Sequence, residues 1–149
     1  MADPMAGDAD ATPFPPGGLE LTQLFVVSDL ARSTAFYRDV LGAEVYGEYG
    51  GTSCVLRFAG SWLLLVTGGE PTRDKPTVRF APPQDPDRVS HELTMKVPDC
   101  RAAYGTLVER GAEFLNPPVE YEWEIRAFLR DPDGHLLEIS ETKQRAGTG

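Results

Sequence analysis

An internal repeat limits the folds that this chain can adopt. The tripeptide Val27-Ser28-Asp29 recurs about 70 residues later as Val97-Pro98-Asp99. Leu41-Gly42-Ala43 recurs in the same way as Arg110-Gly111-Ala112. Each copy places an aspartate before an amphipathic segment and a glycine after it. A repeat of this period indicates two similar supersecondary units that pack against each other.

The first unit has the pattern of one strand, one helix and three further strands. Asp29 suits a helix N-cap, and Gly42 suits the left-handed residue that ends a helix. Between them, apolar residues recur with helical spacing, whereas the flanking segments alternate with a period of two. The predicted elements are a strand at 19–27, a helix from 30 to about 41, and strands at 43–49, 53–59 and 62–66.

The second unit repeats this order after a proline-rich segment. Asp99 and Gly111 bound a second amphipathic stretch, as Asp29 and Gly42 do in the first unit. The predicted strands are 89–97, 112–115, 123–130 and 135–141. The acidic run 120–124 is predicted to be a solvated loop.

Each unit is a sheet with a helix on one side, so neither unit covers both faces of its sheet. We therefore predict a single α+β domain of paired βαβββ modules, in which a curved mixed sheet surrounds a cleft. The predicted segments are a disordered arm at 1–18, a first module at 19–67, a linker at 68–88, a second module at 89–142 and a flexible tail at 143–149.

Charge and hydropathy exclude several classes of partner. The chain has 14 basic and 23 acidic residues, a net charge of −9, so it lacks a basic surface for nucleic acids or anionic membranes. No apolar run approaches the roughly 20 residues of a membrane-spanning helix. The N-terminus lacks the basic start and apolar block of a signal peptide. Cys54 and Cys100 lie far apart, which indicates reduced thiols in a cytoplasmic protein.

A hairpin near the C-terminus places an acid inside an apolar strand. Asp131-Pro132-Asp133-Gly134 has the residues of a tight turn, and the following His135 is expected to be solvated. Strand alternation puts Glu138 on the opposite face from its apolar neighbours, and Glu92 on the matching face of the strand at 89–97. A buried carboxylate needs partners, so Glu138 faces either solvent or a functional cavity.

The segments from Phe25 to Gly42 and from Phe128 to Glu138 resemble the vicinal oxygen chelate superfamily. This superfamily includes glyoxalase I, fosfomycin- and bleomycin-resistance proteins and extradiol dioxygenases. The resemblance extends from about Leu19 to Thr142, and it is specific for the superfamily rather than for one reaction. It implies paired βαβββ modules around a U-shaped cleft, often completed across a homodimer, in agreement with the repeat.

The resemblance also implies a divalent metal held by the first and last strands of each module. The matching positions are Thr22, Leu64, Glu92 and Glu138. Leu64 has no donor atom and Thr22 is a weak donor, so the implied ligand set is incomplete. A shift of one residue in strand register would instead bring Gln23, His91 and Glu138 together. Both alternatives stay open: a site for Zn, Ni, Mn, Fe or Mg, or no metal.

Glu138 and Glu92 are the predicted catalytic pair, as metal ligands or, without a metal, as a base and its neighbour. The alternative is that they form structural ion pairs with Lys96 and Arg126. The predicted ligand-binding set consists mainly of aromatic residues, which offer contact area, and arginines, which hold carboxylates or phosphates. The alternative is core packing for the aromatic residues and solvent exposure for the arginines. That set is Thr22, Arg57, Trp62, Tyr121, Trp123, Arg126 and Phe128.

Three functions agree with this pattern. The first is a glyoxalase-like lyase or isomerase that stabilises an enolate or oxyanion of a small oxygenated metabolite. The second is a metal-free protein that sequesters a small molecule such as an antibiotic, and the net charge of −9 favours a cationic one. The third is a dioxygenase-like enzyme. Glu138 favours an enzyme, whereas the missing donor at Leu64 favours a binding protein.

Overall fold

The computed structural model describes residues 12–144. The predicted arm at 1–18 and tail at 143–149 therefore fall largely outside the described residues. The part of the arm that is described, from Thr12 to Gly18, contains no helix or strand. No helix among the described residues is long and apolar enough to cross a membrane.

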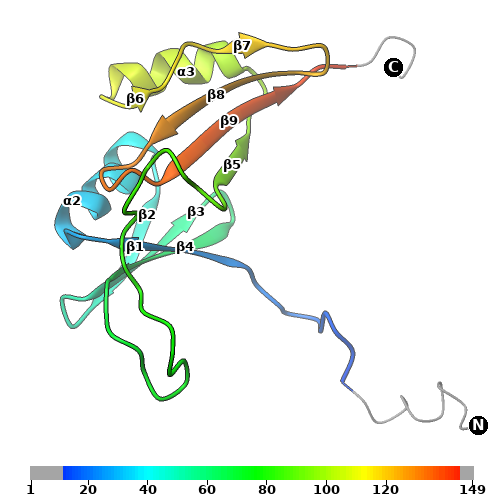
Figure 1. Ribbon diagram of the computed structural model, residues 1–149. Coiled ribbons are helices and arrows are strands. Elements are labelled where there is room, and N and C mark those ends of the chain that lie inside the picture. The colour runs from blue at the N-terminus through cyan, green and yellow to red at the C-terminus, as the bar shows by residue number, and fades with distance from the viewer. Residues whose placement is uncertain (1–11, 145–149) are drawn as a thin grey trace, which may run out of the picture.

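The first module has the predicted order of one strand, a helical segment and three further strands (Figure 1). Its elements are β1 (Thr22–Val27), α2 (Leu30–Ala35), the π-helical η2 (Phe36–Val40), β2 (Glu44–Tyr49), β3 (Ser53–Phe58) and β4 (Ser61–Thr67). The four strands form one sheet in the order β1-β4-β3-β2, with β1 parallel to β4 and the other pairs antiparallel. A β-bulge between Val45 and Gly47 interrupts the register of β2.

The second module repeats this topology. Its elements are β5 (Leu93–Lys96), α3 (Cys100–Glu109), β6 (Glu113–Phe114), β7 (Val119–Glu120), β8 (Glu124–Arg130) and β9 (Leu136–Thr142). The sheet order is β5-β9-β8-β6, with β5 parallel to β9, and β7 pairs with β8. The paired βαβββ architecture predicted from the repeat is confirmed.

Both helices begin where the sequence predicts. The carboxylates of Asp29 and Asp99 accept hydrogen bonds from the backbone amides of Arg32 and Ala102, each at 3.0 Å. Gly42 and Gly111 follow the helical segments with φ of 84° and 95°, a conformation that a Cβ atom would strain. The first helical segment finishes in a π turn, which its periodicity did not predict.

Two segments of the second module differ from the prediction. β5 begins at Leu93 rather than 89, so His91 and Glu92 precede the strand. The acidic run predicted to be a loop begins with a short strand, β7, whose Val119 and Glu120 pair with Arg126 and Ile125. Periodicity does not detect so short a strand, because two residues are too few to show alternation.

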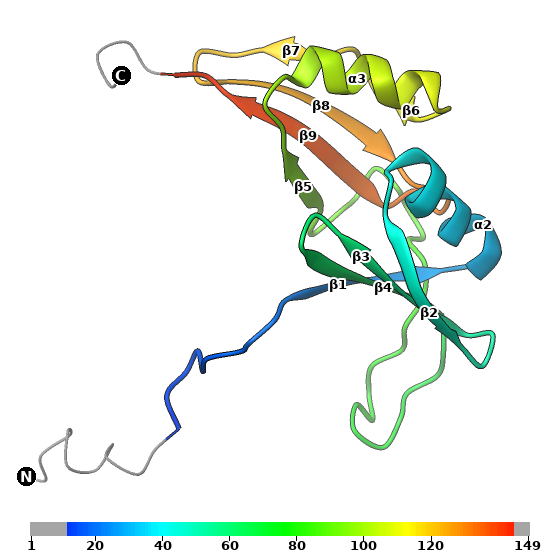
Figure 2. The ribbon, with the colours of Figure 1, turned by 180° about the vertical axis from the view of Figure 1, so that it is seen from behind.

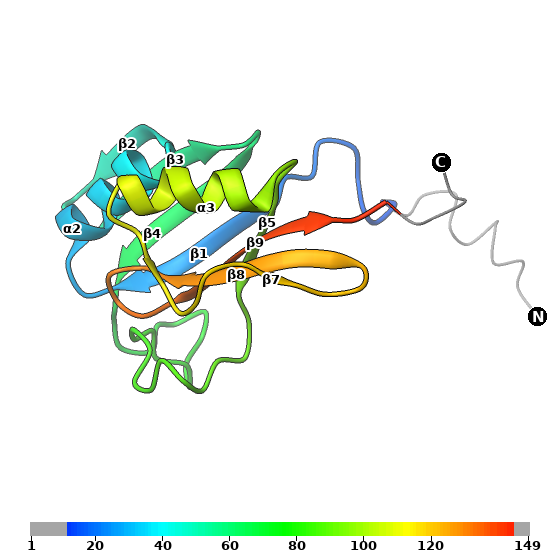
Figure 3. The same cartoon turned by 90° about the horizontal axis from the view of Figure 1, so that it is seen from above.

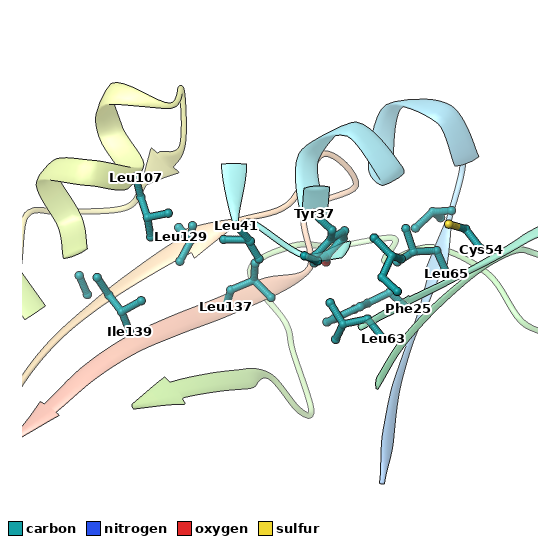
Figure 4. Packing of buried hydrophobic residues seen from close by; sticks show 14 of the residues in the cluster. Phe25, Tyr37, Leu41, Cys54, Leu63, Leu65, Leu107, Leu129, Leu137 and Ile139 are labelled. Carbon is teal, nitrogen blue, oxygen red and sulfur yellow. The ribbon is translucent and has the colours of Figure 1, made fainter. Parts of the chain in front are cut away.

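The core lies between the helices and the sheets and continues from one module into the other. Seen from above, α2 and α3 cover the same side of the sheets (Figure 3). Figure 4 shows Tyr37 and Leu41 from the first module near Leu129 and Leu137 from the second. Each is less than a tenth exposed. Because the two modules share one apolar layer, they form a single packing unit.

A polar cluster joins the modules where the β8–β9 turn meets α2 (Figure 2). Asp131 is buried and accepts a hydrogen bond from the hydroxyl of Tyr37 at 2.8 Å. It also accepts the backbone amides of Asp133 and His135 at 2.9 Å each. Asp133 in turn accepts bonds from the amide and hydroxyl of Ser28. The turn that identifies the fold in the sequence therefore also ties the second module to the first.

His135 belongs to the same junction. Its Nε2 lies 2.7 Å from the carbonyl oxygen of Val26, and its ring centroid lies 5.0 Å from that of Phe25. The expectation that His135 is solvated was wrong, because the turn packs against β1 rather than projecting into water.

Candidate functional site

Each sheet has one face turned away from its helix, which we call the open face. Thr22, Trp62 and Leu64 lie on the open face of the first sheet, because β1 and β4 pair in register. Arg57 joins them from β3, opposite Trp62. The open face of the second sheet carries Thr94 and Lys96 on β5, Glu138 and Ser140 on β9, and Arg126 and Phe128 on β8.

Glu138 is the most enclosed acid on the open faces. It lies between Thr94 and Phe128 in the strand register and is 7% exposed. The pKa of Glu138 is raised from 4.5 to about 7, chiefly by burial and then by a hydrogen bond with Glu92 and the charge of Glu92. The nearby Arg126 opposes this shift. The two carboxyl groups predicted as a pair do lie together, and Glu138 is close to half-protonated at neutral pH.

The guanidinium of Arg126 lies over two aromatic rings. Its guanidinium carbon is 4.7 Å from the ring centroid of Tyr121 and 5.6 Å from that of Phe128. One terminal nitrogen donates to Glu124 at 2.9 Å. The buried Nε has no hydrogen-bond partner, and neither has the buried hydroxyl of Ser140, the residue opposite Arg126 on β9. Two adjacent unpaired polar atoms on one face are suited to hold a water molecule or a ligand acceptor.

The open face of the first sheet is aromatic. The rings of Tyr46 and Trp62 meet edge to face with centroids 5.2 Å apart, and the Arg57 guanidinium lies 4.4 Å from the Trp62 centroid. The indole nitrogen of Trp62 donates to Glu20. Two cavities adjoin this group, one of about 420 Å³ beside Arg57 and one of about 390 Å³ beside Tyr49. Both volumes are large enough to hold part of a drug-sized molecule.

The positions implied for a metal do not form a ligand set in one chain. Thr22 and Leu64 lie on the first open face, whereas Glu92 and Glu138 belong to the second. Within residues 12–144, no group of three or more His, Cys, Asp or Glu side chains is placed to hold a metal ion. The two carboxylates that are close together lack the third protein ligand that catalytic metal sites generally have.

The alternative triad from a shifted register is not brought together either. Gln23 lines a cavity of about 540 Å³ on the helix side of the sheets, with Leu63, Met95 and Leu107. Its amide donates to the carbonyl oxygen of Leu24 at 3.2 Å. His91 lines a separate cavity of about 200 Å³ beside His135. The register of β1 against β4 is continuous from Thr22 to Val27, so no bulge turns Gln23 towards the open face.

The predicted ligand-binding residues divide between the modules. Thr22, Arg57 and Trp62 gather on the first open face, and Arg126 and Phe128 gather on the second with Tyr121 beside them. Trp123 lies just before β8 and is 49% exposed. The cavities on the open faces are each lined by residues of one module.

The predicted ligand-binding set did not include several residues on or beside these faces, among them Glu20, Tyr46, Lys96 and Ser140. Tyr46 is two residues after Glu44, which pairs with Arg57, so alternation could have placed it on the open face. Ser140 is two residues after Glu138 on the same strand, so alternation could have found it. Glu20 precedes the first strand, and no local pattern connects it with Trp62.

A model of the glyoxalase/bleomycin resistance protein/dioxygenase superfamily matches residues 20–139. The chain belongs to this superfamily. The match spans both modules and includes every residue assigned above to an open face except Ser140. The resemblance first identified from the two motifs is therefore confirmed for the family and its fold.

Relatives within the superfamily have different activities. The metallothiol transferase FosB of Shouchella clausii is 30% identical over 118 residues, which cover 77% of this chain and 74% of the relative. Lactoylglutathione lyase from Agrobacterium tumefaciens has a TM-score of 0.66 at 18% identity, over 85% of this chain and 95% of the other. The antibiotic-binding protein TnmS3 from Streptomyces has a TM-score of 0.60 at 21% identity, over 85% and 98%. The two structural similarities concern the fold alone.

Proposed function

We propose that the protein is a homodimeric small-molecule-binding member of the superfamily, and that it binds its ligand without a metal. In this proposal the first open face of one copy and the second open face of the other together form the cleft. The observation that carries the proposal is the aromatic surface of the first open face, which a ligand can contact. At the two positions implied for metal ligands on this face, Thr22 offers only a hydroxyl and Leu64 offers no donor atom.

The exposed apolar side chains on these faces support a shared cleft. Tyr46 and Tyr49 are 70% and 53% exposed beside the first open face, and Tyr121 is 48% exposed beside the second. Large aromatic residues that are exposed in one chain commonly mark an interface or a ligand site. The cavities on each open face are lined by one module only. In a symmetric dimer, the second copy would cover the cavities of both open faces.

A metal fits the residues of this chain poorly. The superfamily contains metal-dependent members, and FosB is named as a metallothiol transferase. Here a composite cleft would offer Glu92 and Glu138 from one copy and Thr22 and Leu64 from the other. Two carboxylates without histidine do not make a site for zinc, iron or nickel. Ligand binding is therefore assigned to side-chain contacts and hydrogen bonds.

Complementation between two variants tests this proposal. A thermal-shift screen first identifies a ligand, since a compound that binds only the folded protein raises its melting temperature. Trp62→Ala and Arg126→Ala should each weaken binding about tenfold or more, because each removes a contact of one half-site. In a purified heterodimer of the two variants, one cleft combines both substituted faces and the other combines both wild-type faces, so one of its two sites should bind normally. In a random equimolar mixture half of the dimers are heterodimers, so about a quarter of all sites should bind normally.

Two results would contradict the proposal. Heterodimers with no restored site would place the cleft within one chain. Binding that disappears after chelator treatment and returns with zinc, nickel, manganese or iron would assign the site to a metal. The unchanged affinity of chelated protein is the expected result.

A second function, a glyoxalase-like enzyme acting by proton transfer, is supported by the carboxyl pair. A group with a pKa of about 7, such as Glu138, suits a general acid or base near neutral pH. If this function is correct, Glu138→Gln should lower the turnover of the ligand by about 100-fold or more while its dissociation constant changes little. Direct NMR observation of the ligand over time checks this result, with Glu122→Gln on the exposed loop before β8 as control. A ligand that stays chemically unchanged with wild-type protein would leave binding as the function.

A further inference from the structure

We propose that the cavity beside Tyr46, Tyr49 and Trp62 recognises an organic cation, such as a quaternary ammonium group carried on an apolar body. This inference rests on the proposed function, because it names the class of ligand that the same cleft takes. It is carried by the arrangement of rings and charges on the first open face.

The cavity is an open depression with an aromatic wall and one acidic residue. It has a volume of about 390 Å³, and Tyr46, Tyr49 and Trp62 supply three ring systems to its wall. Val55 and Leu64 complete an apolar floor, and Thr22 adds a hydroxyl. Aromatic faces carry negative potential, so several rings around one cavity attract a weakly hydrated cation.

Among residues 12–144, Glu20 is the only charged residue that lines this cavity. Its carboxylate accepts the indole N–H of Trp62, which holds the acid against the aromatic group. A carboxylate has more acceptor positions than this one bond uses, so it can still face a ligand cation. The net charge of −9 produces a negative long-range potential, which also attracts a cation.

One ring of this group already contacts a cation of the chain. The Arg57 guanidinium lies 4.4 Å from the Trp62 centroid, and both residues line the neighbouring cavity of about 420 Å³. That neighbouring cavity is also lined by Glu20 and Glu44, so its single arginine faces two acids. An anionic ligand would therefore meet net negative charge in both cavities, whereas a cationic ligand would not.

Matched cationic and neutral probes test the inference. Benzyltrimethylammonium and its uncharged carbon isostere neopentylbenzene have nearly the same shape, so a difference in their affinity reports the charge. The purified full-length protein is titrated with each probe, and NMR follows its backbone amide signals together with the indole N–H signal of Trp62. We expect the cation to bind at least about fivefold more tightly, with saturable shifts of this signal.

Variants of the cavity wall identify the groups responsible. Trp62→Leu and Glu20→Gln should each lower the affinity for the cation about fivefold or more and change that for the neutral probe much less. Phe80→Leu and Glu70→Gln are matched controls, because they remove a ring stacked on Lys75 and an acid paired with Arg79 in the linker. The melting temperature of each variant verifies that it folds.

Each other outcome is decisive. Equal affinity for the two probes, or stronger binding of benzoate than of benzyltrimethylammonium, would overturn the cationic class and leave the proposed cleft standing. Cation binding that is unaffected by Trp62→Leu would overturn the assignment to this cavity. Failure of the cationic, neutral and anionic probes alike would overturn this inference, whereas the small-molecule function is decided separately by the thermal-shift screen.

Discussion

Asp131→Ala should be the most destabilising single substitution outside the apolar core, lowering the free energy of unfolding by about 2–4 kcal/mol. The carboxylate is buried and accepts the Tyr37 hydroxyl and two backbone amides. Burial raises the pKa of Asp131, and these hydrogen bonds act in the opposite direction. Alanine would leave the buried Tyr37 hydroxyl without an acceptor and remove one of the contacts that tie the turn to the first module. Urea unfolding followed by circular dichroism gives the measurement.

Two control variants separate the buried interaction from general effects. Tyr37→Phe removes the hydroxyl and keeps the ring in the core, so it should cost about 1–2 kcal/mol. Asp87→Ala removes an acid whose side chain is 83% exposed and pairs with Arg130, so its effect should stay within roughly 0.5 kcal/mol. If Asp131→Ala and Asp87→Ala had equal effects, the junction would not depend on the buried carboxylate.

Glu138→Gln should make the protein more stable than wild type at alkaline pH, by up to about 3 kcal/mol at pH 8. Its pKa is raised from an ordinary 4.5 to about 7, first by burial and then by Glu92. The folded protein therefore holds the proton more tightly than the unfolded chain. Stability contributed by this group is present below pH 4.5 and is lost as the pH rises through 7. Glutamine resembles the protonated acid and cannot ionise, so the variant keeps that stability.

The charges around Glu138 define the controls for this measurement. Glu92 and Glu124 raise its pKa, Arg126 lowers it, and Lys96 lies on the adjacent strand. Glu122→Gln makes the same change in net charge on the exposed loop before β8 and should not alter the pH profile. Unfolding curves at pH 5 and pH 8 supply the test. The same difference between Glu138→Gln and wild type at both pH values would refute a raised pKa.

Most of the fold could be predicted because its determinants are local. Asp29 and Asp99 bond to amides three residues away, and Gly42 and Gly111 set the backbone at the ends of the helices. Short elements were less predictable. The strand β7 forms because Val119 and Glu120 meet β8, and two residues carry no periodic signal of their own.

For the candidate site, the sequence predicted only the face of the sheet on which each residue lies. Alternation placed Glu138 and Glu92 on the same side, and the structure brings them together. It did not predict that Arg126 lies over Tyr121 and Phe128, nor that Ser140 lies opposite it with an unpaired hydroxyl. These relations depend on how β8 pairs with β9 and how the loop before β8 folds back.

By itself, the sequence determined the repeat, the two βαβββ modules and the presence of an acid at Glu138 on a strand facing away from the core. Only the tertiary structure decided what surrounds that acid and what the turn before it contacts. The preferences of turn residues and the alternation of strand faces involve residues two to four positions apart, so the local sequence is enough to predict them. The contact of Asp131 with Tyr37 spans 94 positions, and that of Trp62 with Glu20 spans 42. Such contacts depend on how whole modules pack, and a local sequence pattern does not predict that packing.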